Sequence, residues 1–195
     1  MNYMDLVELF QEKCRAITTP DVLELGTRRV GDRPSTLRTS WVPHAQSYVG
    51  TDQESGLDVD LVADLHQLAD QVGEEQYDAI TSCSTLEHVK YPHLAAHQIM
   101  RTLRVGGLLF IQTHHTFPLH AHPYDYFRFS REALAGLFGT QMGFQTLATD
   151  YEFPAQIHSE QDPVAKEHPA FLNARLVGQK LSKTPSTYIY ELDTV

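Results

Sequence analysis

The segment from Asp21 to Thr27 (DVLELGT) constrains the fold of this chain more than any other. It is a short, apolar-rich run that carries one acid and ends at a glycine, a pattern typical of a buried strand that stops at a tight turn. In an open α/β sheet, a nucleotide-like ligand binds at the carboxyl end of the first strand. The turn at Gly26 is therefore the strongest candidate for a binding site in the sequence.

The segments that follow predict a parallel sheet covered by helices. An almost wholly apolar run such as Leu108 to Thr113 is expected where helices cover both faces of a sheet. The segments Phe144 to Tyr151 and Leu172 to Gly178 alternate more and predict a closing antiparallel pair. The other predicted strands are residues 47–52, about 59–63 and 77–82, and residues 104–107 predict a turn. The predicted helices are residues 3–17, with Asp5 and Glu8 early, residues 92–103, with Pro92 near the start, and residues 130–139, with Ser130 as N-cap. The 20-odd residues between the first two strands are long enough to hold a crossover helix.

A chain of 195 residues without repeats or linker composition is expected to form one domain. The order of strands and helices predicts a doubly wound, Rossmann-like α/β fold over residues 1–195. Residues 1–20 are assigned to an N-terminal helix. Residues 152–170 are rich in Pro, Glu and His, and a connection of that length predicts a lid or a substrate loop.

Charge and composition disfavour several classes of partner. Asp and Glu number 25 against 15 for Lys and Arg, and this net charge of −10 disfavours a surface that tracks nucleic-acid phosphates. No apolar run approaches the roughly 18 residues that span a bilayer. Two cysteines form no disulfide framework, so a reducing, cytoplasmic location is expected.

The first turn restricts the kind of nucleotide that can bind. Residues 26–31 align with G-x-G-x-x-G, but Arg28 stands at the second glycine, where the backbone must approach a pyrophosphate. The phosphate-binding G-K-[ST] sequence is also lacking. Asp52 ends the second strand, where an aspartate can accept hydrogen bonds from both ribose hydroxyls. A ligand with a ribose and no phosphate, such as S-adenosylmethionine, suits this site.

At this point the sequence resembles the class I S-adenosylmethionine-dependent methyltransferases of the small single-domain type. The resemblance covers roughly residues 20–150 and implies a seven-stranded sheet, mostly parallel, with an antiparallel last strand. It rests on five motifs in the family's order and spacing: VLELG at 22–26, VGTD at 49–52, VADL at 62–65, YDAI at 77–80 with LEHV at 86–89, and LRVGGL at 103–108.

The resemblance implies roles in cofactor binding for Glu24, Gly26, Thr27, Asp52, Asp64, Leu65, Ser82 and Ser84. Glu24 would lie near the cofactor's amino group, Asp52 would bind the ribose, and Asp64 with Leu65 would flank the adenine. In the family, backbone carbonyls after the fourth strand face the methionine amine. Three of these residues also have a simpler interpretation: Glu24 as a salt-bridge partner of Arg28 or Arg29, Asp52 as a turn aspartate and Asp64 as a helix N-cap.

Catalytic candidates follow the fourth and fifth strands, on the same edge of the sheet. Glu87 or His88 could accept a proton from a substrate, since an imidazole is matched to neutral pH, or could only brace the loop. A base or substrate ligand is also expected among His114, His115, His120, His122 and Asp125. In the alternative interpretation, the aromatic residues of 124–129 are core and Asp125 pairs with Arg128. The favoured catalytic candidates are His88, His120, His122 and Asp125.

These observations predict methyl transfer from S-adenosylmethionine to an oxygen or nitrogen of a small molecule, such as a sugar or a secondary-metabolite precursor. The main alternative is a binding module of the same fold that is weak or inactive as a catalyst and acts in a complex. A nicotinamide oxidoreductase is disfavoured by Arg28. His93 and His97 stand four residues apart on a predicted helix, yet no acid or cysteine completes a zinc set beside them, so no metal is expected.

Overall fold

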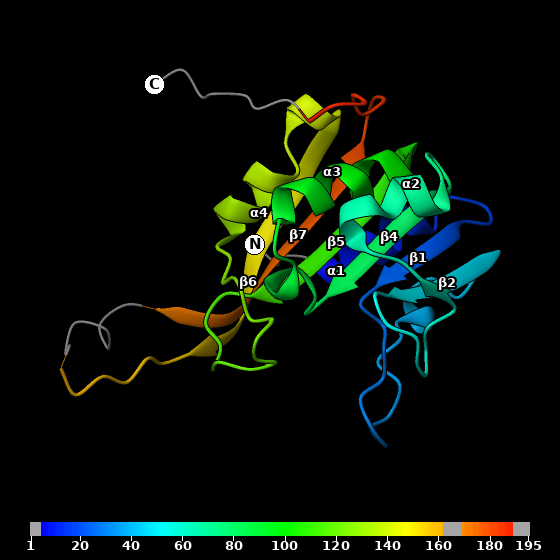
Figure 1. Cartoon of the computed structure of the whole chain (residues 1–195). Coiled ribbons are helices and arrows are strands. Elements are labelled where there is room, and N and C mark those ends of the chain that lie inside the picture. The colour runs from blue at the N-terminus through cyan, green and yellow to red at the C-terminus, as the bar shows by residue number, and fades with distance from the viewer. Residues whose placement is uncertain (1–4, 162–168, 189–195) are drawn as a thin grey trace.

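The computed structural model describes residues 5–161 and 169–188 and contains a seven-stranded sheet in the order β3-β2-β1-β4-β5-β7-β6 (Figure 1). Strands β1 to β5 pair in parallel, and β7 lies antiparallel to both of its neighbours, β5 and β6. The predicted fold and the predicted antiparallel pair are confirmed. The strands are β1 (Asp21–Leu25), β2 (Ser47–Asp52), β3 (Leu61–Val62), β4 (Tyr77–Cys83), β5 (Leu103–His114), β6 (Phe144–Ala155) and β7 (Ala170–Lys180).

Side chains of the central strands point alternately to two apolar layers, as the period of two in a strand requires. Leu23 and Ile80 belong to the larger layer, under α2 (Leu68–Val72), α3 (Pro92–Thr102) and α4 (Arg131–Leu137). Val22 and Phe110 belong to the smaller layer, with Phe10 of α1 (Leu6–Cys14). Helices thus cover both faces, which explains why β1 and β5 are apolar almost throughout.

The predicted helix signals are found at the helix ends. Asp5 caps α1 by accepting a hydrogen bond from the Val7 amide, and Ser130 caps α4 in the same way from the Ala133 amide. Pro92 stands at the start of α3. Each cap satisfies a backbone donor that would otherwise lack a partner in the first turn. The described residues also contain four short 3₁₀ helices: η1 (Thr39–Trp41), η2 (Leu65–Gln67), η3 (Leu86–His88) and η4 (Thr140–Met142).

Two connections differ from the expectation. Residues 26–46 were long enough for a crossover helix, but only the three residues of η1 are helical there, in a segment interrupted by Pro34 and Pro43. In β5, the register with β4 passes from Leu103 directly to Leu108, so residues 104–107 bulge out where a turn was expected.

The connection between β6 and β7 is shorter than the predicted loop. β6 continues to Ala155 and β7 begins at Ala170, so both ends of the predicted segment 152–170 are strand. Residues 162–168 lie outside the described residues. In Figure 1 the described residues 156–161 extend away from the sheet.

Candidate active site

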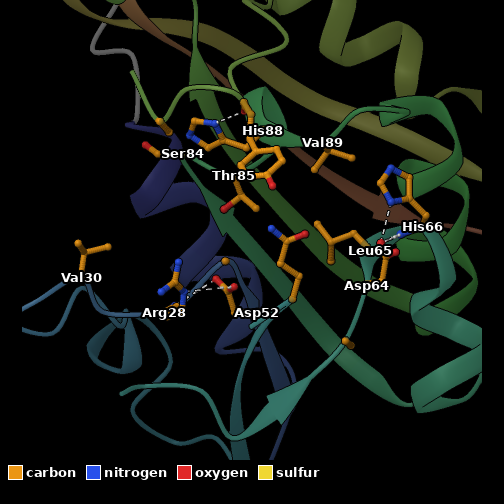
Figure 2. Close-up of a pocket in the computed structure, with 15 residues that line it drawn as sticks. Arg28, Val30, Asp52, Asp64, Leu65, His66, Ser84, Thr85, His88 and Val89 are labelled. Atoms are coloured by element: carbon orange, nitrogen blue, oxygen red, sulfur yellow. Dashed lines mark hydrogen bonds and ion pairs between the residues drawn. The ribbon is translucent and has the colours of Figure 1, made fainter. Parts of the chain in front are cut away.

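A pocket of about 330 Å³ lies at the carboxyl ends of the central strands (Figure 2). This is the edge at which doubly wound sheets bind their ligands. Six of the predicted site residues line it: Gly26, Asp52, Asp64, Leu65, Ser84 and His88. Residues that the sequence analysis did not assign also line it, among them Arg28, His66, Thr85, Val89 and Tyr124.

The turn after β1 depends on a glycine for two independent reasons. Gly26 has a φ of +73°, in the left-handed region that side chains disfavour. A Cβ at Gly26 would also lie 2.1 Å from Oγ1 of Thr85, which follows β4. The Thr85 hydroxyl donates to the carbonyl oxygen of Leu25 at 3.2 Å, so the contact is part of how β1 and β4 end together.

Asp52 lies at the end of β2, at the predicted ribose position, with a side chain that is 18 % exposed. Its carboxylate accepts a hydrogen bond from the Glu54 amide and faces Arg28, with 3.8 Å between Arg28 Nε and Asp52 Oδ1. Arg28 also pairs with Glu54 at 3.2 Å. The arginine at the position of the missing second glycine therefore lies against the acid that the sequence assigns to the ribose (Figure 2).

Asp64 and Leu65 lie on the other side of the pocket, at the start of η2. Asp64 caps η2 by accepting a hydrogen bond from the His66 amide, as its simpler interpretation predicted. The same oxygen lies 2.6 Å from His66 Nδ1. Partial burial raises the pKa of Asp64, but these two hydrogen bonds outweigh it and hold that pKa below its usual value. The carboxylate caps the helix and borders the pocket at once.

Three predicted cofactor residues do not line the pocket. The carboxylate of Glu24 is buried and accepts hydrogen bonds from the Arg38 amide and guanidinium and from the Tyr48 hydroxyl. Glu24 is thus a salt-bridge partner, with Arg38 in place of Arg28 or Arg29. Thr27 is buried and donates to the carbonyl oxygen of Asp58 at 2.6 Å. Ser82 is fully buried in β4.

His88 is the predicted catalytic residue that reaches the pocket. It ends η3, and its Nδ1 lies 2.8 Å from the carbonyl oxygen of Tyr124. Because a carbonyl only accepts, Nδ1 carries the hydrogen and Nε2 carries the lone pair. His88 also packs against the ring of His120, with 4.7 Å between the ring centroids.

Of the other three catalytic candidates, the structure brings His120 and Asp125 together beside His88 and leaves His122 apart. Asp125 receives two hydrogen bonds from Arg128, at 2.6 and 2.9 Å, and one from the His120 amide. Arg128 holds the pKa of Asp125 well below its usual range, which makes this carboxylate a poor base at neutral pH. This is the pairing that the alternative interpretation described. His122 is exposed and does not line the pocket.

Glu87 and His114 meet behind His88, although 26 residues separate them in the sequence. Glu87 is fully buried, and its Oε1 lies 3.1 Å from His114 Nε2 and 3.9 Å from His88 Nε2. Burial lowers the pKa of His114, and the Glu87 carboxylate opposes that change. The sequence places both residues at strand ends on one edge, but the contact between them follows only from the parallel pairing of β4 with β5.

A comparison with protein families shows to which family the chain belongs. A model of the methyltransferase domain matches residues 3–149, which include every strand from β1 to β5. The chain belongs to this family. The resemblance seen in the sequence is thereby confirmed, and the chain is an S-adenosylmethionine-dependent methyltransferase. A comparison with curated proteins gave no match.

Solved methyltransferase structures share the fold at low sequence identity. The YcgJ protein of Bacillus subtilis superposes with a TM-score of 0.62 at 14 % identity, over 90 % of this chain and 98 % of that one. A methyltransferase of Archaeoglobus fulgidus has a TM-score of 0.59 at 12 % identity, over 89 % and 94 %. The 1,6-didemethyltoxoflavin-N1-methyltransferase of Burkholderia thailandensis, whose structure contains S-adenosylhomocysteine, has a TM-score of 0.58 at 15 % identity, over 88 % and 78 %.

The pocket residues fit the cofactor of this methyltransferase. Two carboxylates, Asp52 and Asp64, border one cavity from the ends of neighbouring strands, with the apolar Leu65 beside them. Carboxylates accept hydrogen bonds from hydroxyl and amine groups, both of which a nucleoside presents. Gly26 lines the same cavity with its backbone alone. Helices long and apolar enough to cross a bilayer are absent from the part of the chain that the structure describes.

Proposed function

We propose that this methyltransferase methylates an oxygen or a nitrogen of a small molecule. The observation that carries the proposal is the orientation of His88 in the pocket wall: its Nδ1–H donates to the Tyr124 carbonyl, which leaves Nε2 of the neutral ring as a hydrogen-bond acceptor. A hydroxyl or amine must lose a proton when it gains a methyl group, so an acceptor beside it promotes the reaction. The bound cofactor supplies an electrophilic methyl group on a sulfonium.

The residues that line the pocket are assigned roles in binding the cofactor. Asp52 accepts from the ribose hydroxyls, Asp64 and Leu65 contact the adenine, and Gly26 gives the backbone room to approach the cofactor. Ser84 and Thr85 border the same space from the end of β4. With the cofactor aligned on these residues, the protein contributes mainly orientation and exclusion of water. Arg28 must leave Asp52 free to bind the ribose, so we expect it to move or to share that carboxylate.

A small acceptor is favoured by charge. The net charge of −10 opposes the approach of a polyanion. The Burkholderia neighbour is an N1-methyltransferase whose structure contains 1,6-didemethyltoxoflavin, so in that protein the same fold binds a small molecule that is methylated on nitrogen.

Transfer of a labelled methyl group tests the acceptor class. The purified enzyme is incubated with methyl-labelled S-adenosylmethionine and, separately, with a small-molecule extract, total RNA and total protein. We expect label in the small-molecule fraction, on oxygen or nitrogen. Label confined to RNA or protein would overturn the acceptor class, and binding without any transfer would favour the binding-module alternative.

A substitution of His88 tests its role. His88→Ala is expected to lower kcat by at least about 10²-fold, the smaller end of what positioned proton transfer contributes. Retention of labelled cofactor by the variant is expected to match that of the wild type, because Asp52 and Asp64 are unchanged. A kcat within about twofold of the wild type would remove His88 from the mechanism.

A further inference from the structure

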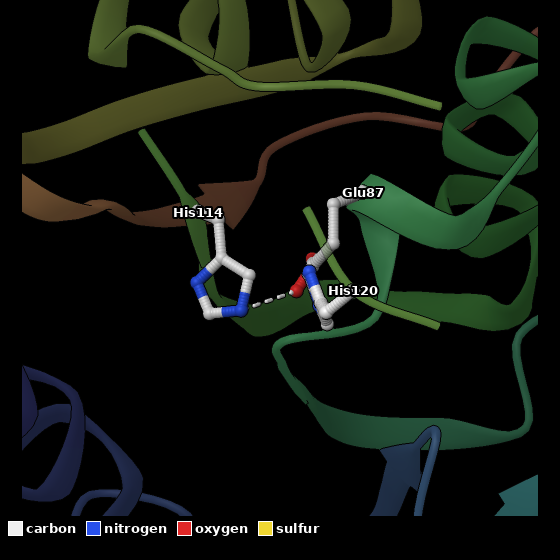
Figure 3. Close-up of side chains that lie close together, drawn as sticks. All are labelled: Glu87, His114 and His120. Carbon is white, nitrogen blue, oxygen red and sulfur yellow. Dashed lines mark ion pairs between the residues drawn. The ribbon is translucent and has the colours of Figure 1, made fainter. Parts of the chain in front are cut away.

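Three ligand-type side chains converge behind the pocket from segments far apart in the sequence (Figure 3). Glu87 comes from η3, His114 from the last position of β5, and His120 from the segment before α4. One potential ligand atom from each lies within 4.8 Å of the other two. Glu87 and His114 are buried, and His120 is partly exposed.

The carboxylate of Glu87 is only half satisfied. Its Oε2 accepts a hydrogen bond of 2.6 Å from the Thr113 hydroxyl, whereas its Oε1 is buried and accepts no hydrogen bond within the described chain. An ionised oxygen buried in this way is costly unless a positive charge compensates it. The nearest group to Oε1 is Nε2 of His114, at 3.1 Å.

The hydrogen bonds of His114 decide which of its nitrogens faces Glu87. Asn173 donates through Nδ2 to Glu152 at 3.1 Å, which turns its Oδ1 toward His114. His114 Nδ1 lies 3.2 Å from that oxygen and therefore carries the hydrogen. In the neutral ring, the lone pair of Nε2 then points at a carboxylate oxygen. Two lone pairs at that distance repel each other unless a cation lies between them.

His120 is oriented in the same manner. Its Nδ1 lies 3.1 Å from the carbonyl oxygen of Pro118, so Nε2 is the free ligand atom. His88 and Asp125 form a second cluster with His120, in which the potential ligand atoms also lie within 4.8 Å of one another. An imidazole whose other N–H donates to a backbone or side-chain oxygen is the usual arrangement of a metal-binding histidine.

We propose that Glu87, His114 and His120 form a binding site for a divalent transition-metal ion of the zinc type. Two imidazoles and one carboxylate suit zinc-like ions, whereas magnesium and calcium prefer oxygen ligands throughout. Tetrahedral coordination at 2.0–2.2 Å places ligand atoms about 3.4 Å apart. The 3.1 Å between Glu87 Oε1 and His114 Nε2 is close to that spacing.

The proposed metal site does not include His93 and His97, the pair of histidines with metal-ligand spacing in the sequence. His93 and His97 share α3, but His97 Nε2 lies 2.8 Å from the Pro185 carbonyl and neither histidine belongs to a ligand cluster within the described residues. An ion at the proposed site would instead link η3, β5 and the segment before α4 at the border of the pocket. The sequence could not indicate it, because its ligands meet only through the sheet.

Calorimetric titration with Zn²⁺ tests the proposal. The tag-free chain is stripped with a chelator, dialysed and titrated, and we expect one ion per chain. Glu87→Gln keeps the size of the side chain and the Thr113 contact but removes the charge, and His114→Ala removes a nitrogen ligand. Each is expected to weaken zinc binding at least tenfold. Bound Co²⁺ is expected to show d–d absorption in the wild type and to lose it in both variants.

His115→Ala is the matched control. His115 is the next residue along the chain, but its Nδ1 lies 2.9 Å from the Phe129 carbonyl and its ring packs on Tyr151. Its removal is expected to leave zinc binding unchanged. His120→Ala provides a third ligand variant in an irregular segment, for use if a core variant does not fold by circular dichroism. Absence of zinc binding by the wild type would overturn the proposal. A proton shared by Glu87 and His114 would then be what compensates the two facing lone pairs. Equal binding by all ligand variants would also overturn it.

Discussion

Gly26 combines backbone and packing requirements at one position. Its positive φ allows the chain to turn sharply after β1, and its missing side chain leaves room for Thr85. Gly31 has a similar φ of +61°, but nothing lies within 4 Å of the place where its Cβ would be. A comparison of the two positions therefore distinguishes the free energy lost to a positive φ from the free energy lost to a clash with Thr85.

Gly26→Ala is expected to destabilise the protein more than Gly31→Ala does. Each substitution places a side chain in the left-handed region, at about 1–3 kcal/mol, and only Gly26→Ala adds a clash with Thr85. Denaturant unfolding of the two variants measures the difference. We also expect Gly26→Ala to lose retention of the cofactor, whereas Gly31→Ala keeps it. Equal losses of stability would show that the Thr85 side chain moves away from the new methyl group without destabilising the protein.

At the residue scale, the sequence predicts positions better than contacts. Asp52 could be placed at the pocket because a residue that ends a strand lies at a known edge. Glu24 could not be excluded from the pocket, because its partners Arg38 and Tyr48 come from a connection of irregular structure and from a neighbouring strand. The pairing of Asp125 with Arg128, three residues apart, was visible as an alternative because it is local.

At the scale of elements, two polar clusters outside the pocket connect strands and helices of the sheet. Asp21, at the start of β1, accepts a hydrogen bond of 2.7 Å from the Ser47 hydroxyl of β2 and one of 3.1 Å from Arg104 of β5. The Ser47 hydrogen bond, with Arg104 in support, lowers the pKa of Asp21 against the opposing effect of burial. Asp21 thus links three strands through its ionised form.

Ser47→Ala is expected to reduce the free energy of unfolding by about 0.5–1 kcal/mol at pH 7. The native pKa of Asp21 lies below its unfolded value of about 3.9, so the stabilisation is present above that pH and declines as the pH falls further. The difference between wild type and variant should therefore shrink below about pH 4. Urea unfolding at a series of pH values measures it, and a difference independent of pH would contradict the assignment.

The second cluster surrounds Arg175 of β7, which is 5 % exposed. Its guanidinium donates to Asp150 and Glu152 of β6 and to Asp5 at the start of α1. Replacement of this buried cation leaves carboxylates uncompensated, which is far costlier than the loss of a surface pair. The cluster fixes α1 to the antiparallel end of the sheet.

Arg175→Met is expected to lower the free energy of unfolding by about 3–5 kcal/mol, because it leaves its acidic partners unpaired. Arg131→Met is the matched control, since Arg131 pairs with Glu132 and both side chains are well exposed, at 46 % and 66 %. The control is expected to change stability by less than about 0.5 kcal/mol. Similar values for the two variants in denaturant unfolding would contradict a buried, stabilising role for Arg175.

The sequence predicts elements where the hydrophobic period is strong and fails where a connection lacks one. The apolar runs of β1, β4 and β5 and the cap of α4 were recognisable, whereas Asp5 was expected only as an early acid and is the cap of α1. The segment between β1 and β2 was long enough for a helix, yet its prolines and polar residues leave only η1. The bulge of residues 104–107 in β5 resembled an ordinary glycine turn, because the register that absorbs it is set by β4.

For the whole molecule, the order of weak motifs predicted more than any motif alone. The seven-stranded sheet and its antiparallel β7 follow from that order and are confirmed by the structure and the family match. The pocket that Gly26, Asp52, Asp64 and Leu65 line is the consequence of this topology. The Arg28 side chain beside Asp52 is the feature that most distinguishes this site from a glycine-rich one.

The central claim is that this pocket binds S-adenosylmethionine through Asp52. Its most direct test is calorimetric titration of the wild type, Asp52→Ala and Glu54→Ala with S-adenosylhomocysteine. Glu54 is the matched control, since it also pairs with Arg28 but does not line the pocket. We predict one site per chain in the wild type and in Glu54→Ala, and no measurable binding in a folded Asp52→Ala. No binding by the wild type, or unchanged affinity in Asp52→Ala, would contradict the account.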